Sequence, residues 1–266
     1  MSTMPWGEAA DFPAVYEELN VPAFFTAFAE ELLDRAQPRE GESMLDVATG
    51  TGIVLRRARA RCPGVERLVG LDLTPGMLAV ARGKSDGLDI EFFEGDAGLL
   101  PFEDGSFDLV TCQQGLQFFP AREQALGEFR RVLAADGRAV VACWCEVETA
   151  PGHQALTDVL SHHLPELEPV ARVPFSLSSG DELRRLLDQA GFRDVEVERV
   201  EGTVRFRSPE EFTRSFMEGT PMAITMAEVS PEQRDALARN IAQSVRERVG
   251  DPVITTMVTH VAIARA

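Results

Sequence analysis

Residues 44–54 read MLDVATGTGIV and decide the fold. An apolar run that contains one acid, Asp46, leads to two glycines, Gly50 and Gly52, and a second apolar run follows. This order is typical of a buried strand that ends in a tight turn and opens a helix. Such a turn presents backbone N–H groups and the positive end of a helix to a ligand. The stretch therefore predicts a ligand site at the carboxyl end of the strand.

The surrounding sequence alternates short apolar runs with helical patterns, which is typical of a parallel α/β sheet. The expected strands span 43–47, 67–73, 89–95, 107–112, 138–144, 194–200 and 254–266. The expected helices span about 53–61, 75–82, 121–133, 152–164 and 181–190, the last with Ser179 and Glu182 as a capping box. The predicted fold class is therefore α/β with a doubly wound sheet.

Two segments lie outside this alternation. Before residue 43, the spacing of Phe25, Phe28, Leu32 and Ala36 predicts a helix with Pro22 in its first turn. Later, SPEE at 208 and SPEQ at 230 each place a capping serine before a proline, which predicts two helix starts. We expect an N-terminal helical lid over 1–42, a ligand-binding sheet domain over 43–200 and 253–266, and a helical cap insertion over 201–252.

Composition excludes some partners. The 266 residues carry 43 acids and 26 basic residues, a net charge of −17, which repels nucleic-acid phosphates. The short run RRARAR at 56–61 lies on an expected helix and is interpreted as a solvated face. No apolar run approaches the roughly 20 residues that cross a bilayer, and the N-terminus lacks a signal-peptide pattern. We expect a cytoplasmic protein with neither nucleic acid nor membrane as a partner.

The four cysteines, Cys62, Cys112, Cys143 and Cys145, form no C-x-x-C pair, and three of them lie in apolar, strand-like runs. Buried reduced thiols are therefore expected, with no metal site and no disulfide framework. In an extended strand Cys143 and Cys145 share a face, and Trp144 lies on the other.

Three ligand classes could use the glycine turn. A nucleoside triphosphate would need the lysine of G-x-x-x-x-G-K-[ST], which is absent here. A dinucleotide would want a third glycine, but Leu55 stands at that position. The third class is S-adenosylmethionine, whose carboxylate and amine, not a phosphate, lie over such a turn.

On these residues the chain resembles the class I S-adenosylmethionine-dependent methyltransferases, in particular the ubiquinone/menaquinone-biosynthesis-like small-molecule subgroup. The family's first motif, Asp/Glu-x-Gly-x-Gly-x-Gly, reads DVATGTG here, with Ala48 at the first glycine. Asp72 closes LVGLD and Asp96 closes FFEGDA, each at the end of an expected strand. LPFEDGSFDLV and LGEFRRVLAADGRAVVA are similar to the later motifs. The resemblance covers residues 43–145 closely and 175–266 loosely. It implies a Rossmann-like, seven-stranded sheet with the last two strands antiparallel.

The resemblance also implies a cofactor site for S-adenosyl-L-methionine, with S-adenosyl-L-homocysteine as product. Asp72 would accept hydrogen bonds from the ribose hydroxyls, an apolar residue of LTPGML would pack on the adenine, and Asp96 with Ala97 would meet the adenine amino edge. Gln113 and Gln114 would contact the methionine part. Tyr16 lies in a segment that resembles the family's N-terminal lid and would contact the cofactor carboxylate or the acceptor. The expected cofactor residues are Tyr16, Ala48, Thr49, Gly50, Asp72, Leu73, Met77, Asp96, Ala97, Gln113 and Gln114.

The acceptor is expected to be a small hydrophobic or aromatic metabolite of secondary metabolism. After the fourth strand the chain reads CQQGLQFFP and lacks the Asn/Asp-Pro-Pro-Tyr of amino-methylating enzymes that act on nucleic acid or protein. O-methylation is the first expectation, with C- or N-methylation next. Catalysis would rest mainly on proximity and desolvation, with His153 as an optional general base. The expected substrate-pocket residues are Phe24, Phe118, Phe119 and Trp144.

Two other functions stay open. The chain could bind the cofactor without methyl transfer, as a regulator or as a pericyclic or isomerising catalyst. A nicotinamide oxidoreductase is a third alternative, which Leu55 disfavours. We expect a monomer or a homodimer, and nothing in the sequence demands dimerisation.

Overall fold

The computed structural model describes residues 12–266, which form two compact units. The sheet unit comprises Thr26–Glu146, Val173–Gly202 and Met257–Ala266. The helical unit comprises Val147–Arg172, Thr203–Thr256 and the described residues of Met1–Phe25. The division predicted from the sequence, into a lid over 1–42, a sheet domain and a cap over 201–252, stays a prediction.

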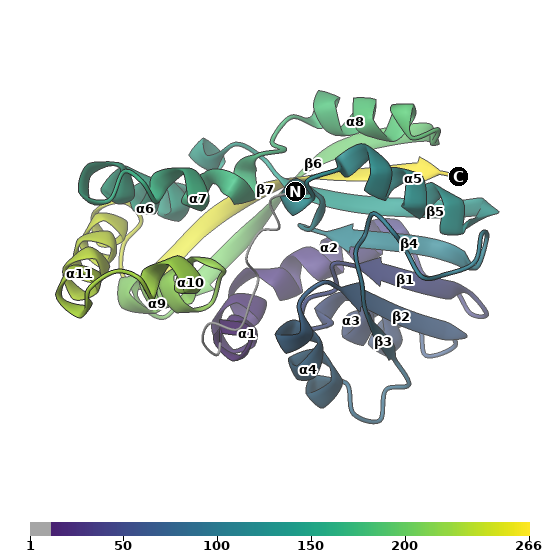
Figure 1. Cartoon of the computed structure of the whole chain (residues 1–266), viewed down its shortest axis with the longest axis horizontal. Coiled ribbons are helices and arrows are strands. Elements are labelled where there is room, and N and C mark those ends of the chain that lie inside the picture. The colour runs from purple at the N-terminus through teal and green to yellow at the C-terminus, as the bar shows by residue number, and fades with distance from the viewer. Residues whose placement is uncertain (1–11) are drawn as a thin grey trace. The chain divides into compact units, whose positions relative to one another are not determined.

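Seven strands form one sheet in the order β3-β2-β1-β4-β5-β7-β6 (Figure 1). They are β1 (Ser43–Val47), β2 (Arg67–Asp72), β3 (Glu91–Glu94), β4 (Phe107–Gln113), β5 (Leu133–Trp144), β6 (Arg193–Phe206) and β7 (Val253–Arg265). The first five strands pair in parallel, and β7 pairs antiparallel with β5. The predicted α/β sheet, with its parallel strands followed by an antiparallel pair, is confirmed.

Helices cover both faces of the sheet, because successive strand residues point to opposite sides. The helices of the sheet unit are α2 (Thr26–Ala36), α3 (Ile53–Arg61), α4 (Pro75–Lys84), α5 (Arg122–Val132) and α8 (Gly180–Gln189), with short turns η2 (Leu116–Phe118) and η4 (Val173–Phe175). On one face Cys143 belongs to the buried cluster that includes Phe129 of α5 and Leu183 of α8. On the other face Trp144 meets Phe28 of α2 edge-on, with ring centroids 4.8 Å apart. The predicted opposition of Cys143 and Trp144 is confirmed.

The helical unit is built around α11 (Pro231–Arg248), which packs against α6 (Pro151–His163) and α9 (Pro209–Glu218). Its other elements are α1 (Phe12–Val15), η1 (Tyr16–Phe25), η3 (Val147–Thr149), α7 (Glu168–Arg172) and α10 (Met222–Met226). The Asn20 side chain of η1 donates to the carbonyls of Ser215 (3.3 Å) and Gly219 (2.9 Å) and so closes the end of α9. No helix within residues 12–266 is long and apolar enough to cross a membrane.

Three serines cap helices as their sequence context predicts. Ser179, Ser208 and Ser230 each accept a hydrogen bond from the backbone N–H three residues later, at 3.2–3.3 Å. These bonds satisfy donors that a helix start otherwise leaves unpaired. The predicted starts of α8, α9 and α11 are therefore confirmed.

Three predicted boundaries are wrong. Pro22 lies inside η1, a π-helical segment that precedes α2, and not in the first turn of a helix. Strand β6 continues to Phe206 because the alternation persists: Val204 and Phe206 are buried, and Arg205 between them is exposed. Strand β5 begins at Leu133, which pairs with Phe107 across a bulge, although the following sequence AADG is typical of a turn.

Candidate functional site

Three residues of the turn between β1 and α3 have left-handed backbone. Ala48, Gly50 and Gly52 have φ angles of 57°, 55° and 81°. The turn is fixed by the N–H of Thr49, which donates to the carbonyl of Leu71 on β2 at 3.0 Å. Glycine occupies the left-handed region at little cost, whereas alanine there is strained. Ala48, where the family motif has glycine, therefore holds a conformation that its own side chain disfavours.

Asp46, at the fourth position of β1, holds this turn through its side chain. Its carboxylate accepts hydrogen bonds from the hydroxyls of Thr49, in the turn, and Thr111, on β4, both at 2.7 Å. The side chain is 1% exposed, and burial raises its pKa to about 7 although the two hydroxyl bonds act in the opposite direction. The nearby charge of Asp72 raises the pKa further. Asp46 thus joins the turn to the neighbouring strand and is not itself presented to solvent.

Asp72, at the end of β2, links the turn to the next loop. One carboxylate oxygen accepts from the N–H of Gly50 at 2.8 Å, and the other accepts from the N–H of Thr74 at 2.9 Å. Burial raises the pKa of Asp72, and these backbone bonds counteract the rise. Each oxygen of a carboxylate can accept a second hydrogen bond. The position is therefore compatible with the predicted contact to a pair of ribose hydroxyls.

The residues expected around the adenine lie at the ends of β2 and β3. Leu73 follows Asp72 and is 53% exposed, which is high for a large apolar side chain. Met77 is half-buried on α4, and Ala97 is buried. Asp96 is exposed, and its carboxylate accepts from the N–H of Gly98 at 2.8 Å. An exposed apolar side chain next to these carboxylates is compatible with the predicted packing on a purine ring.

The loop after β4 lies against the glycine turn. A Cβ built on Gly115 would come within 2.6 Å of the Cβ of Ala48, closer than real atoms approach. Gln114 is buried and donates from Nε2 to the hydroxyl of Thr259 on β7 at 2.9 Å. Gln113 is half-buried at the last position of β4. The structure therefore brings the predicted residues at 48 and 113–114 together at one edge of the sheet.

Gln117 is a polar residue of this loop that the sequence did not single out. Its side chain is 2% exposed, and neither its amide nitrogen nor its oxygen has a hydrogen-bond partner among residues 12–266. In the same part of the chain the Thr51 hydroxyl and the Gln114 Oε1 are also buried without a partner. A buried polar group without a partner costs about 1–3 kcal/mol. Such groups are rare in native proteins and concentrate where function requires them.

The aromatic residues expected in the substrate pocket differ in their surroundings. Phe118 is half-buried in η2, and Phe119 packs against the main hydrophobic cluster. Trp144 is 4% exposed against Phe28. In the helical unit, Phe24 contacts Phe206, with ring centroids 6.2 Å apart. Their role as a substrate pocket stays a prediction.

The remaining predicted residues belong to the helical unit. The ring of Tyr16 lies 4.9 Å from that of Phe25. His153, in the first turn of α6, meets the rings of Phe212 and Phe216 on α9 edge-on, at 5.5 and 6.0 Å. These apolar surroundings lower its pKa to about 4, because burial penalises the imidazolium. At neutral pH the imidazole is therefore uncharged and able to accept a proton, although it is a weak base.

The chemistry of the turn fits the cofactor expected from the sequence. Small residues and backbone N–H groups line the turn, a carboxylate ends the next strand, and an exposed leucine follows that carboxylate. Within residues 12–266 no cluster of histidine, cysteine or carboxylate side chains has the arrangement of a metal site. The arrangement can hold a zwitterionic, nucleoside-containing ligand with the atoms it already presents.

Known proteins agree with this geometry. Residues 45–141 match the family described as "Methyltransferase domain". The chain is 48% identical to the demethylmenaquinone methyltransferase of Thermus thermophilus over 131 residues, which are 47% of this chain and 59% of that protein. It is 33% identical over 190 residues to the ubiquinone/menaquinone biosynthesis C-methyltransferase UbiE of Dinoroseobacter shibae, covering 68% of this chain and 74% of that protein. The matched part is therefore between about half and three quarters of these relatives.

A solved structure shares the fold. Phosphoethanolamine N-methyltransferase 2 of Haemonchus contortus, determined with phosphomonomethylethanolamine and S-adenosylhomocysteine, superimposes with a TM-score of 0.62 at 21% identity. The match covers 95% of this chain and 56% of that one. The chain belongs to the class I S-adenosylmethionine-dependent methyltransferases, and within them it is similar to the quinone-biosynthesis subgroup. The predicted family and cofactor are confirmed, whereas the roles of individual residues stay predictions.

Proposed function

We propose that the chain transfers the methyl group of S-adenosylmethionine to a small aromatic metabolite. The observation that carries this proposal is that two carboxylates hold the glycine turn. Asp46 accepts a hydrogen bond from the Thr49 hydroxyl, and Asp72 accepts one from the N–H of Gly50. The two carboxylates fix the turn from both sides. Backbone donors and the outer lone pairs of Asp72 are then preorganised for a ligand, which reduces the entropy lost on binding.

The cofactor supplies an activated methyl group, so the protein needs to contribute position more than acid–base chemistry. Asp72 would hold the ribose, and Leu73 and Met77 would bind the adenine between apolar surfaces. Asp96 and Ala97 would meet the edge of that ring. The loop that carries Gln113 and Gln114 would face the methionine part. Holding the acceptor in line with the methyl group and excluding water accounts for most of the acceleration in such a reaction.

The proposed acceptor is a phenol or quinol ring, and ring carbon is the favoured methylated atom. The relatives are named for C-methylation in quinone biosynthesis, which places carbon before the oxygen expected from the sequence. O- and N-methylation remain alternatives. Phe118 and Phe119 are half-buried after β4 and support a planar acceptor, whereas Trp144 is 4% exposed against Phe28. His153 is the proposed base where the acceptor has a proton to lose.

The first experiment is calorimetric titration of the full chain with S-adenosylmethionine, S-adenosylhomocysteine and NAD. We expect micromolar binding of the two adenosyl ligands, no binding of NAD, and loss of at least tenfold in affinity for Asp72→Ala. Asp86→Ala is the matched control, because Asp86 is an exposed acid of the same unit. Binding of NAD instead would support the oxidoreductase alternative and contradict the proposal.

The second experiment tests transfer. A 1,4-naphthoquinol with an unsubstituted ring carbon is incubated with S-adenosylmethionine carrying a labelled methyl group, and NMR of the product locates the label. Label on ring carbon is expected. Label on oxygen would retain the methyltransferase activity and correct the methylated atom. Tight cofactor binding with no transfer to any quinol, phenol or amine would favour a protein that binds the cofactor without methyl transfer.

A further inference from the structure

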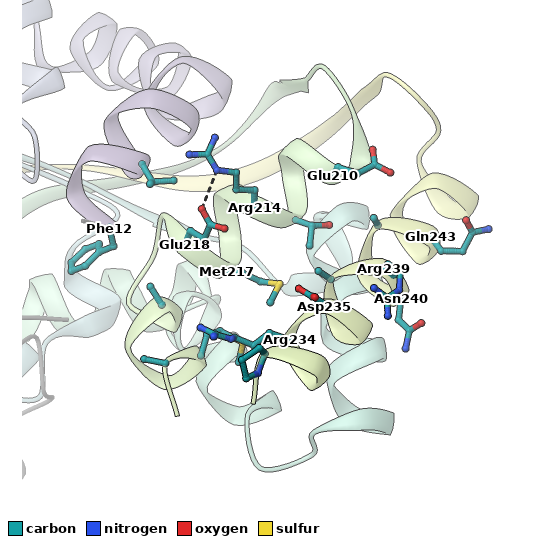
Figure 2. A pocket seen from close by; sticks show the side chains of 18 of the residues that line it. Phe12, Glu210, Arg214, Met217, Glu218, Arg234, Asp235, Arg239, Asn240 and Gln243 are labelled. Carbon is teal, nitrogen blue, oxygen red and sulfur yellow. Dashed lines mark hydrogen bonds and ion pairs between the residues drawn. The ribbon is translucent and has the colours of Figure 1, made fainter. Parts of the chain in front are cut away.

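A groove of about 1050 Å³ lies within the helical unit, between α9, α10 and α11, with Phe12 and Val15 of α1 at one end (Figure 2). Its base is apolar: Met217 of α9, Ala223 and Met226 of α10 and Ala242 of α11 are each less than 10% exposed. Pockets for small organic ligands have volumes of about 300–1,000 Å³. The groove is therefore large enough for one such molecule and lies apart from the glycine turn in sequence.

Helix α11 forms the groove with one of its two faces. Leu237, Ile241 and Val245 form the buried face of the helix. The residues that line the groove recur three or four positions apart, which places them on a separate stripe. They are Pro231, Arg234, Asp235, Ala238, Arg239, Ala242, Gln243 and Arg246, and Asn240 lines the groove beside this stripe. Alanine at 238 and 242 adds little side-chain volume to this stripe.

The charges around the groove are not balanced. Arg214 pairs with Glu218 at 3.0 Å and with Glu18 at 3.5 Å, and Arg246 pairs with Glu210 at 2.6 Å and with Asp251 at 3.4 Å, so both arginines are neutralised by acids. Arg234 and Arg239 have no ion-pair partner among residues 12–266, and Asp235 between them has none either. Figure 2 shows Arg234, Asp235 and Arg239 on the α11 side of the groove. The residues that line the groove include four arginines and three acids, so the lining itself carries one excess positive charge, on a chain whose net charge is −17.

We propose that this groove binds a free amphipathic organic anion, a molecule with an aliphatic body and a single carboxylate. The body would lie over Met217, Met226 and Ala242, and the carboxylate would be held between Arg234 and Arg239. A guanidinium binds a carboxylate through two parallel hydrogen bonds, and half-burial of Arg234 beside apolar side chains reduces competition from water. Asp235 would disfavour ligands with more than one negative charge at this end. The site would serve binding or regulation and is independent of the proposed methyl transfer.

The test compares decanoate with 1-decanol, which has the same chain without the charge, by calorimetric titration of the full chain. We expect decanoate to bind at least tenfold more tightly than decanol. Arg234→Gln and Arg239→Gln should each weaken decanoate binding several-fold and leave decanol binding unchanged. Ala238→Phe, which fills the wall between the two arginines, should weaken both. Arg185→Gln is the control for loss of one positive charge, because Arg185 lies on α8, outside the groove, and donates to the Gln189 side chain at 2.7 Å.

Each other outcome contradicts the proposal. Equal binding of decanoate and decanol, or no binding of either, would leave no role for the arginines. If the chain fails to bind decanoate but binds vesicles of anionic lipid, and the same variants lose vesicle binding, the groove would be assigned to a membrane surface. Self-association seen by light scattering and lost in the same variants would assign it to a second copy of the chain. Because decanoate binding requires no methyl transfer, failure here would leave the proposed enzymatic function untouched.

Discussion

Gly115 and Ala48 face each other so closely that only one of them can carry a Cβ atom. A Cβ on Gly115 would lie 2.6 Å from the Cβ of Ala48 and 2.8 Å from the Sγ of Cys112. The loop after β4 therefore packs directly on the turn after β1. The side chain that replaces the family's glycine at position 48 is accommodated because position 115 has none. A departure from the motif in one loop is thus matched by a glycine in another.

We expect Gly115→Ala to lower the free energy of unfolding by about 1–3 kcal/mol, the usual cost of overpacking a buried position. Combined with Ala48→Gly, which removes one of the two clashing atoms, the same substitution should cost less. Urea unfolding of the two single variants and the double variant measures this coupling. Additive effects within 0.3–0.5 kcal/mol, about the limit for independent sites, would mean that the two residues do not share the space.

Gln117→Met is expected to raise the free energy of unfolding by about 1 kcal/mol, because methionine fills a similar volume without burying an unpaired amide. Gln114→Met is the matched control. It removes the hydrogen bond from Gln114 to Thr259 and should lower stability. Urea unfolding of both variants in the absence of cofactor distinguishes the two residues. Equal destabilisation would show that the Gln117 amide is satisfied in solution.

Asp46→Asn is expected to change how stability depends on pH. The pKa of Asp46 is raised from 3.8 to about 7 by burial, so between these values the folded protein keeps a proton that the unfolded chain has released. The contribution of Asp46 to the free energy of unfolding therefore falls as pH rises from about 4 to about 7 and is constant above. Asparagine cannot ionise. The free energy of unfolding of Asp46→Asn minus that of the wild type should therefore increase over this range, by at most about 4 kcal/mol.

The measurement is thermal or urea unfolding at several pH values, with Asp86→Asn as the control at an exposed acid. Comparing the variant with the wild type cancels the contributions of the other titrating groups to the pH dependence of stability. The contribution of His153 is one of these, and it changes in the opposite direction. A stability difference that stays constant from pH 4 to pH 7 would contradict the raised pKa of Asp46.

His153 is expected to titrate near pH 4, since its apolar surroundings lower its pKa from 6.5 to about 4. A depressed histidine pKa means that the unfolded chain holds the proton over this range, so the contribution to stability rises as pH increases from 4 to 6.5. NMR of the ring protons, assigned with His153→Gln, measures the midpoint. A midpoint near 6.5 would contradict burial between Phe212 and Phe216.

His153→Gln also tests the proposed base. If the proton of the acceptor passes to this imidazole, the variant should lose about 100-fold in kcat, the lower end of the usual contribution of general acid–base catalysis. Cofactor affinity should stay within twofold. Full turnover with an unchanged pH profile would exclude the base role and leave proximity and desolvation as the sources of catalysis.

The central elements of the fold could be predicted from the sequence because their patterns are local. Strand β1 and helix α3 have the predicted bounds, and the capping serines at 179, 208 and 230 mark helix starts with their own side chains. The extension of β6 to Phe206 was not predicted, because Gly202 and charged residues interrupt the expected strand composition. Gly202 is needed there: a Cβ would lie 2.5 Å from the ring of Phe28. That contact joins residues 174 positions apart and has no local signal.

In the candidate site, too, features with a local sequence pattern could be predicted and features that depend on tertiary packing could not. Asp46, Asp72 and the turn glycines could be predicted, because a family motif fixes their spacing. Gln117 could not, since a glutamine between apolar residues gives no sign of whether its amide has a partner. The groove of α9, α10 and α11 was equally hidden. The periodicity of α11 predicts a helix, but only tertiary packing decides which stripe is covered and which is open.

The sheet order has a consequence for synthesis of the chain. Strand β7 follows β6 along the chain but lies between β5 and β6 in the sheet, so the sheet cannot be completed before β7 has been synthesised. Until then the β5 edge lacks its antiparallel neighbour and exposes unpaired backbone groups, which are prone to aggregation. The N–H of Ala266 itself donates to the carbonyl of Gly137 at 3.0 Å. A chain that is truncated before β7 would therefore be a substrate for chaperones and proteases rather than a weaker enzyme.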